Sequence, residues 1–227
     1  NLEDIPCDCI CVSGNWNPTV HLSSQSGNKL KFDEIISAFI PNQSRQNETA
    51  VGSANGSFTL KKSLEDGFHK GFEISNRLTK KNIKSDTPSS NEKNYGKHEK
   101  FWCMPLPKNK DYKRCVDFQN DVYVSDIELA IREGFRSIEH VKRYTTLGMA
   151  TDQGKTSNLN GLQLVSNIEN KIVPEVGHTT FRPPYTPVTI GTIVGREVGK
   201  HYRPTRKSPM HSWHEKNNAV FVDAGLW

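Results

Sequence analysis

Hydrophobic positions divide the chain into two structured regions with a polar, basic stretch between them. Near the start, "CDCICV" (7–12) is an apolar run that predicts a buried strand. Cys7, Cys9 and Cys11 alternate along it and would share one face, where small thiol side chains pack inward. A glycine-containing turn follows, and Asn17-Pro18 starts a new segment.

A helix is predicted after Thr59, whose hydroxyl is suited to cap it. Leu60, Leu64, Phe68 and Phe72 recur at the spacing of one helix face. Small residues precede this helix in "AVGSANGS" (50–57), which predicts close packing.

The second region predicts a short extended segment over 115–122 and then a helix. The sequence Ser125-Asp126-Ile127-Glu128 has the pattern of a capping box, in which Ser125 and Glu128 satisfy each other's backbone N–H groups. Ile127, Ala130 and Ile131 form the inner face of this helix, and Gly134 ends it.

Two further helices are predicted in the same region. Ser137 can cap a helix through "IEHVKRYTTL" (138–147), which Gly148 stops. The stretch 156–171 predicts another helix with Leu159, Leu162 and Val165 facing inward. Residues 176–195 are rich in Pro and Thr, and we expect extended chain there with no helix.

Composition narrows the function classes. Hydrophobic residues make up 34% of the chain and the net charge is +5. Residues 77–114 hold 11 Lys/Arg and 4 Asp/Glu, but they have few aromatic residues, no periodicity and many Ser, Asn and Pro residues. A solvated linker is therefore favoured over a nucleic-acid-binding surface there. No apolar run has the roughly 18–20 residues of a membrane span. Five cysteines, without secretory features, favour a reducing cytoplasm and no membrane partner.

The stretch "GMATDQGKT" (148–156) resembles a nucleotide-binding P-loop. A P-loop has four residues between its first Gly and its Gly-Lys-Thr, and this stretch has five, Met149 to Gln153. A P-loop also follows a buried strand, whereas the residues before Gly148 predict a helix. The nucleotide-hydrolase interpretation is therefore disfavoured.

Four longer stretches together resemble the alpha subunits of heterotetrameric sarcosine oxidases. They are "VSGNWNPTVHLSSQSG" (12–27), the run from Val116 to Asn158, "GHTTFRPPYTPV" (177–188) and "SPMHSWHEKNNAVF" (208–221). The resemblance implies a mixed α+β chain. Its parts would be the end of an NAD-binding α/β domain (1–76), a basic flexible linker (77–98), a small helical BFD-like domain (99–175), an extended connector (176–204) and the start of a folate-binding, aminomethyltransferase-like domain (205–227).

The resemblance also implies that the 148–156 loop corresponds to a cluster-binding loop of some relatives. Some relatives hold a [2Fe–2S] cluster in this domain through four cysteines, which correspond to Cys115, Asp117, Asp152 and Ser157 here. One thiol of four remains, so we expect no iron–sulfur cluster. The loop instead predicts a helix N-terminus with free N–H groups beside cationic side chains, which is typical of an anion site. The alternative is that Lys142 and Arg143 only solvate a helix surface.

The implied cofactors are FMN, shared with the beta subunit, and NAD. The candidate residues for the FMN phosphate are Lys142, Arg143, Thr145, Thr146, Gly154, Lys155 and Thr156. The candidates on the NAD side are Gly14, Trp16, Asn17, Thr19 and His21, although Trp16 could equally be a core aromatic residue. No catalytic residue and no metal ligand is expected in this chain.

The implied activity is oxidative demethylation of sarcosine to glycine, with FAD and tetrahydrofolate bound elsewhere in a complex with beta, gamma and delta subunits. Methylene-tetrahydrofolate and hydrogen peroxide would be products, and the chain alone would be inactive. The alternative from another class is a non-catalytic assembly module that holds partner subunits. Nucleic-acid binding through residues 77–114 is the weakest of the three interpretations.

Overall fold

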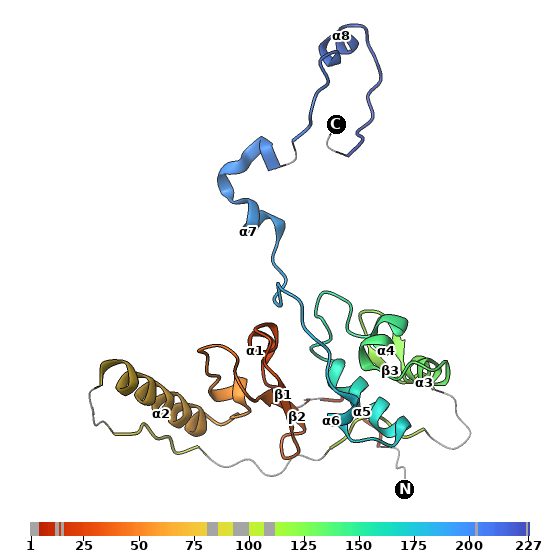
Figure 1. Ribbon diagram of the computed structural model, residues 1–227. Coiled ribbons are helices and arrows are strands. Elements are labelled where there is room, and N and C mark those ends of the chain that lie inside the picture. Colours follow the sequence, from red (N-terminus) through yellow and green to blue (C-terminus); the bar gives the residue numbers. More distant parts are fainter. Residues whose placement is uncertain are drawn as a thin grey trace. The chain divides into compact units, whose positions relative to one another are not determined.

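The structure is a computed structural model whose described residues are 5–11, 14, 16–80, 86–92, 100–106, 112–202, 204–225 and 227. The chain forms two compact units, Asn1–Tyr185 and Thr186–Trp227, and each is described by itself (Figure 1). The expected basic linker lies partly outside the described residues, which omit 81–85 and 93–99.

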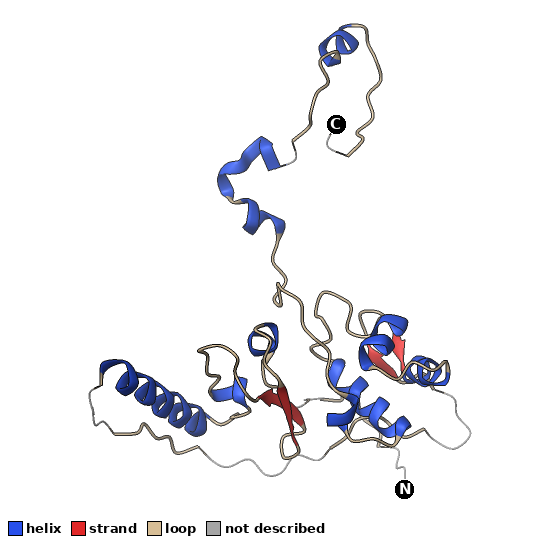
Figure 2. Cartoon of the chain, viewed as in Figure 1, coloured by secondary structure: helices blue, strands red, loops and turns tan. Residues whose placement is uncertain are grey.

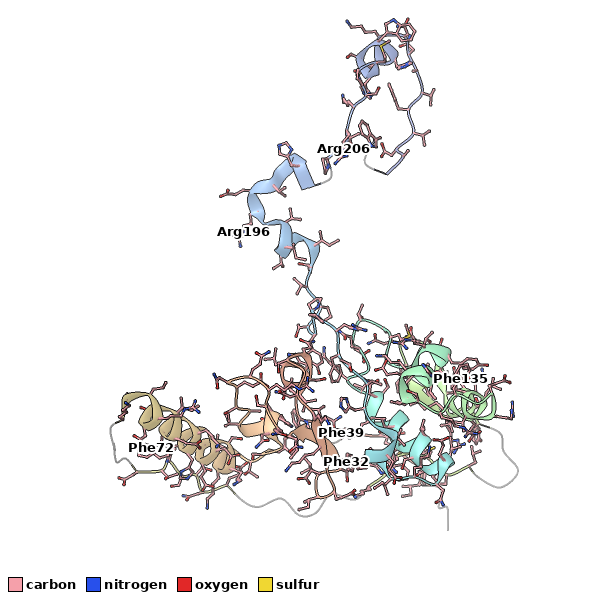
Figure 3. The ribbon with its side chains drawn as sticks, viewed as in Figure 1. Phe32, Phe39, Phe72, Phe135, Arg196 and Arg206 are labelled. Atoms are coloured by element: carbon pink, nitrogen blue, oxygen red, sulfur yellow. The ribbon has the colours of Figure 1, made fainter. Side chains whose placement is uncertain are left out.

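The first part of unit one is a short helix followed by a hairpin and a longer helix (Figure 2). Its elements are α1 (His21–Gln25), β1 (Leu30–Asp33), β2 (Ala38–Pro41), the 3-10 helix η1 (Gly52–Asn55) and α2 (Leu60–Thr79). Strands β1 and β2 are antiparallel, and Phe32 lies opposite Phe39 in their register. The two rings meet edge to face at 5.2 Å between centroids, and both are labelled in Figure 3.

Helix α2 begins where its sequence predicts. The Thr59 hydroxyl accepts a hydrogen bond from the backbone N–H of Lys62 at 3.2 Å, so the predicted N-cap is confirmed. The helix ends at Thr79, three residues inside the stretch expected to be linker. None of its residues is buried, and Leu60 is 58% exposed. The apolar face of α2 is therefore only partly covered by the described residues, with Phe68 and Phe72 half-buried.

The second part of unit one is the helical domain, which holds the largest hydrophobic core. Its elements are β3 (Cys115–Asp117), β4 (Val122–Tyr123), α3 (Val124–Arg132), α4 (Ile138–Thr145), α5 (Asn158–Glu169) and α6 (Val173–Val176). Ile127, Val141, Leu147 and Val165 are fully buried at its centre. The predicted extended segment at 115–122 is an antiparallel hairpin of β3 and β4, in which Cys115 lies opposite Tyr123.

The helix boundaries of this domain differ from the predicted ones by a few residues. The predicted capping box at Ser125 is wrong, because α3 starts at Val124 and the Asp126 carboxylate accepts from the backbone N–H of Tyr123 at 2.8 Å. Ser137 is at the N-cap position of α4, but its hydroxyl makes no capping hydrogen bond. Helix α4 ends at Thr145 because Thr146 is left-handed (φ 63°), before Gly148 is reached.

The inner faces of the helices agree with the sequence pattern. Ile127, Ala130 and Ile131 are buried on α3, and Gly134 follows its end with φ 98°. On α5, Leu162 and Val165 are buried and Leu159 is half-buried. The 3.6-residue period predicted these contacts because helix faces must be apolar where they pack on each other.

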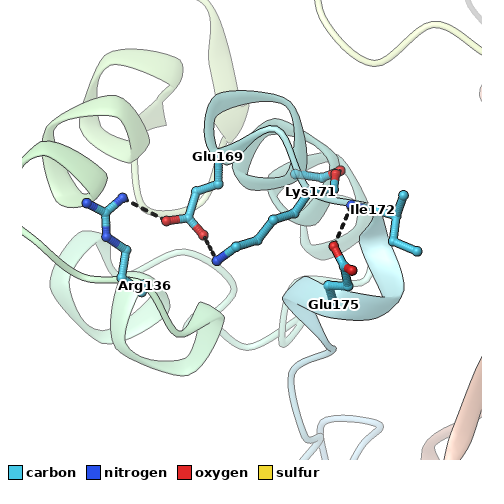
Figure 4. Close-up of polar contacts among 6 residues, drawn as sticks. Arg136, Glu169, Lys171, Ile172 and Glu175 are labelled. Atoms are coloured by element: carbon cyan, nitrogen blue, oxygen red, sulfur yellow. Dashed lines mark hydrogen bonds and ion pairs between the residues drawn. The ribbon is translucent and has the colours of Figure 1, made fainter.

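A buried carboxylate links the loops at one end of this domain (Figure 4). Glu169, whose side chain is 4% exposed, accepts from Arg136 and from Lys171, each at 2.7 Å. The hydrogen bond from Lys171, aided by Arg136, lowers the pKa of Glu169 although burial opposes this. Glu175 accepts from the backbone N–H of Ile172 at 3.2 Å and fixes the start of α6.

The predicted strand at 7–12 is wrong for the residues described. Cys7, Cys9 and Cys11 are exposed, and residues 5–11 are not a strand. A strand needs a hydrogen-bonded partner, and within the described ranges β1 and β2 pair only with each other. Val12, the last residue of the predicted strand, lies outside the described residues.

Unit two consists of short helices joined by extended chain. They are α7 (Ile190–Val194), the 3-10 segment η2 (Arg196–Tyr202) and α8 (His211–Lys216). The expectation that residues 176–195 contain no helix is wrong at α7, because the Thr189 hydroxyl caps it by accepting from the backbone N–H of Thr192 at 3.3 Å. Arg196 and Arg206 belong to this unit (Figure 3). Among the described residues of the chain, no helix combines the length and apolar character needed to cross a membrane.

Candidate functional site

The loop between α4 and α5 owes its shape to two glycines and one asparagine. Gly148 and Gly154 have φ of 66° and 71°, and a Cβ on either would overlap the side-chain amide of Asn158. Asn158 Nδ2 donates to the carbonyl of Gln153 at 2.8 Å. Gln153 itself is left-handed at φ 51°. The unusual Gly-x5-Gly-Lys-Thr spacing is therefore explained by a turn that closes around Asn158.

Three of the four positions where the resemblance puts cluster ligands are engaged in hydrogen bonds instead. Asp117 Oδ2 accepts from the backbone N–H of Gly148 at 2.7 Å and from the Ser157 hydroxyl at 3.4 Å. Asp152 Oδ1 accepts from the backbone N–H of Gly154 at 3.0 Å. Asp117 thus holds the loop onto the β3 strand, while Asp152 closes a turn within the loop.

The fourth position, Cys115, is half-buried. Burial raises the pKa of its thiol, and the carboxylates of Asp121 and Asp117 raise it further. The thiol is therefore held in its neutral form, which is the weaker metal ligand. Within the described ranges, no three His, Cys, Asp or Glu side chains are grouped so as to hold a metal ion.

Several of the N–H groups expected to be free at the start of α5 donate within the loop instead. Lys155 N–H donates to the Asp152 carbonyl at 3.3 Å, and the N–H groups of Ser157 and Asn158 donate to the Gly154 carbonyl at 3.2 and 2.9 Å. These donors are occupied and the Asp152 carboxylate accepts from the Gly154 N–H, so this part of the loop is less suited to an anion than the sequence predicted.

Lys155 lines a different cavity from Lys142 and Arg143. Its ammonium group donates to the carbonyl of Tyr185 at 3.0 Å and lies 4.2 Å from the centroid of the Tyr185 ring. His21 stacks on the same ring at 3.9 Å and 5° between planes. The Phe181 ring meets the Tyr185 ring edge to face at 5.0 Å. Tyr185 therefore joins α1, the α4–α5 loop and the Pro-rich segment.

Burial and the charge of Lys155 lower the pKa of His21, so its imidazole favours the neutral form. His21 Nδ1 is buried and has no hydrogen-bond partner among the described residues. Burial also raises the pKa of Tyr185, with a smaller contribution from Asp152. The stack therefore consists of two neutral rings and one ammonium group.

A cavity of about 510 Å³ lies beside this stack, and we call it the aromatic cavity. Its lining includes residues from both predicted groups, namely Trp16, Asn17, Thr19, Gly154, Lys155 and Thr156. Phe39, His178 and Phe181 supply further aromatic surface. Gly14 is exposed and is not in the lining, and Trp16 is 75% exposed, so it is not a core aromatic residue.

Lys142 and Arg143 line a second cavity of about 670 Å³, which we call the cationic cavity. Arg182 contributes a third cation to it. Glu139 also lines it, pairs with Arg143 at 3.7 Å and accepts from the backbone N–H of Thr180 at 3.0 Å. Three basic residues and one acidic residue line this cavity, a charge balance that suits an anionic ligand.

Thr145 and Thr146 are not part of this lining. The Thr145 hydroxyl donates to the Val141 carbonyl at 2.8 Å and accepts from the Leu147 N–H at 3.2 Å. The Thr146 hydroxyl donates to the Thr145 carbonyl at 2.6 Å. Both hydroxyl groups therefore bond backbone groups at the C-terminal end of helix α4.

Sequence reasoning missed two residues of the cationic cavity, Arg182 and Gln153. The Gln153 side chain accepts from the Arg182 N–H at 2.8 Å and donates to the carbonyls of Arg182 and Pro184 at 2.8 and 3.0 Å. Arg182 lies in a Pro-rich segment that we expected to be a surface connector. The one sequence feature that could have indicated Arg182 is its position beside two prolines. Nothing in the sequence links Arg182 to Gln153.

Comparisons with known proteins agree on one family. The sarcosine oxidase A3 domain matches residues 111–196. The sarcosine oxidase subunit alpha of Rhizobium meliloti (strain 1021) is 37% identical over 238 aligned positions, which cover 99% of this chain and 23% of that protein. The corresponding subunit of Corynebacterium sp. (strain P-1) is 37% identical over 97% of this chain and 23% of its own length.

The chain thus spans about a quarter of the length of these relatives. A solved structure of L-proline dehydrogenase from P. horikoshii superposes with a TM-score of 0.57 at 21% identity, over 79% of this chain and 37% of that one. At this identity the likeness concerns the fold alone. On the sequence similarity, which runs through both units and the A3 domain, the chain belongs to the family of sarcosine oxidase alpha subunits.

Proposed function

We propose that this chain is the central part of the alpha subunit of a heterotetrameric sarcosine oxidase. The complex would demethylate sarcosine oxidatively to glycine, reduce oxygen to hydrogen peroxide and pass the one-carbon unit to tetrahydrofolate. The observation that carries this proposal is the 37% identity to sarcosine oxidase alpha subunits along 99% of the chain. Beta, gamma and delta subunits would be its partners in the cytoplasm, and FAD and tetrahydrofolate would bind outside these residues.

The cationic cavity fits the phosphate of FMN. A flavin phosphate is a dianion at neutral pH and needs several charged donors, and Lys142, Arg143 and Arg182 line this one cavity. Glu139 pairs with Arg143 and so limits the orientations of its guanidinium. When bound, FMN supplies one- and two-electron transfer. The residues of this chain bind and orient its phosphate end.

The aromatic cavity fits a nucleotide ring. Trp16, Phe39 and Phe181 offer ring faces or edges, while Asn17 and Thr19 offer polar groups. We assign NAD to this cavity, with His21 behind the Tyr185 ring. Lys155, Gly154 and Thr156 belong to the same lining, so we move them from the FMN phosphate to the NAD side.

Binding of FMN and riboflavin to the 227-residue chain tests the phosphate assignment, because the two flavins differ only in the phosphate. Lys142→Met and Arg143→Met should each weaken FMN binding about 10- to 100-fold, the effect of one charge-assisted hydrogen bond. Riboflavin binding should stay unchanged. Arg132→Met, which removes an exposed cation of α3, is the matched control. Equal affinities of the unaltered chain for FMN and riboflavin would reject the assignment.

A second candidate function, assembly of partner subunits, is favoured by helix α2. Its apolar positions Leu60 and Leu64 are 58% and 37% exposed, and no residue of the helix is buried. An apolar face of this length that is only partly covered suits contact with another polypeptide. Charged substitutions at Leu64 and Phe68 should then reduce co-purification of partner subunits without changing FMN binding to the chain.

A further inference from the structure

One short segment, residues 179–185, contributes to the lining of both cavities. Thr180 and Arg182 line the cationic cavity, whereas Thr179, Phe181 and Tyr185 line the aromatic cavity. A displacement of this segment would therefore change the walls of both cavities together.

Side chains hold the segment by its backbone. Gln25 donates to the Phe181 carbonyl at 3.5 Å, Lys155 to the Tyr185 carbonyl at 3.0 Å, and Glu139 accepts from the Thr180 N–H at 3.0 Å. Gln153 makes three contacts, one with the Arg182 N–H and two with carbonyls. The Gln153 amide thus bonds both the N–H and the C=O of Arg182, as a residue of a neighbouring strand would.

The two N–H bonds of the Gln153 amide are saturated by these contacts. Its oxygen accepts from Arg182, and its two N–H bonds serve the carbonyls of Arg182 and Pro184. It therefore has no N–H left with which to donate to a ligand, although it lines the cationic cavity. Any effect of Gln153 on an anion must pass through the position of Arg182.

We propose that Gln153 is a positioning residue that holds the Arg182 guanidinium at the phosphate site of the cationic cavity. The proposal rests on the proposed function of that cavity. The backbone of Arg182 is fixed at both its N–H and its C=O, so its side chain starts from a defined point on the cavity wall. Without Gln153 the prolines at 183 and 184 offer no N–H groups to replace these contacts.

A double-mutant cycle on the 227-residue chain tests this with FMN and riboflavin as probes. Gln153→Asn keeps the amide but shortens it by one methylene, and Asn tolerates the left-handed backbone at φ 51°. It should weaken FMN binding about fivefold, within the range of one hydrogen bond, and leave riboflavin binding unchanged. In the Arg182→Ala background the same substitution should have no further effect. Thr151→Ala, an exposed change in the same loop, is the matched control.

The outcomes separate this inference from the proposed function. If Gln153→Asn weakens FMN binding equally with and without Arg182, Gln153 acts on the loop as a whole and the inference is wrong. If Arg182→Ala weakens FMN binding and Gln153→Asn does not, the inference also fails while the cavity assignment stands. If the unaltered chain does not prefer FMN to riboflavin, the cavity assignment fails first. Gln153→Gly, which relieves the left-handed backbone, repeats the cycle should the Asn variant unfold.

Discussion

The carboxylate of Asp117 accepts a hydrogen bond from the hydroxyl of Ser157 at 3.4 Å, and both residues are buried, at 2% and 1% exposure. The resemblance drawn from the sequence implies cysteines at both positions in cluster-binding relatives. The same carboxylate also accepts from the Gly148 N–H at 2.7 Å and from the Gln119 N–H at 2.9 Å. The loop between α4 and α5 is thus held to β3 by a single carboxylate, that of Asp117.

Asp117→Ala should destabilise the chain by about 2–4 kcal/mol. The substitution leaves the buried N–H of Gly148 unpaired and removes hydrogen bonds to a charged group. Ser157→Ala should cost less, about 1 kcal/mol, because a single long hydrogen bond is lost. Urea denaturation followed by circular dichroism measures both. Equal costs for the two variants would contradict the central role given to Asp117.

Iron and acid-labile sulfide should be absent at stoichiometric levels from the intact complex as purified. One of the four aligned ligand positions is a cysteine, Cys115, and its neutral thiol is favoured by a raised pKa. Colorimetric iron and sulfide assays on the complex check this. Two irons and two sulfides per alpha subunit would contradict it.

The pKa of His21 should lie below the reference value of 6.5. Because the folded chain binds this proton less tightly than the unfolded chain, the neutral stack with Tyr185 contributes stability above about pH 6.5. That contribution is lost as the pH falls through the lowered pKa of the folded state. Lys155→Met should move the pKa of His21 part of the way back, since burial remains. Proton NMR titration, with His21→Asn for assignment, measures both values, and a pKa above 6.5 would refute the stacked, neutral imidazole.

Gly154→Ala should be more damaging than Gly134→Ala. Both glycines have positive φ, but a Cβ at Gly154 also overlaps the Asn158 amide, whereas a Cβ at Gly134 meets nothing within 4 Å. We expect Gly134→Ala to lower the free energy of unfolding by about 1 kcal/mol through backbone strain alone. Gly154→Ala should lower it by at least about 2 kcal/mol more because of the overlap. Thermal unfolding of the two variants gives the comparison. Similar midpoints would mean that the loop shifts freely around Asn158.

Periodicity predicted the local elements of the helical domain well. Ile127, Ala130, Ile131, Leu162 and Val165 are buried because helix faces that pack together must be apolar. Helix ends were less accurate, since Asp126 and Ser125 can both form a cap and only packing decides between them. The strand at 7–12 could not be judged from its own residues, because strand formation depends on a partner.

The structure groups the candidate residues differently from the sequence prediction. Lys142, Arg143 and Lys155 were expected around one anion, yet Lys155 binds the Tyr185 carbonyl and lines another cavity. Tyr185 is 30 positions away from Lys155, and a contact over that separation leaves no local pattern. The same applies to Gln153 and Arg182.

The position of the flavin phosphate in the assembled complex tests the account most directly. A cryo-electron-microscopy map of the complex with FMN bound should show the phosphate in the cationic cavity. Its oxygens should lie about 2.7–3.0 Å from the side-chain nitrogens of Lys142 and Arg182, the usual length of charged hydrogen bonds. Phosphate density beside Lys155 in the aromatic cavity, with Lys142 and Arg182 facing solvent, would contradict the account.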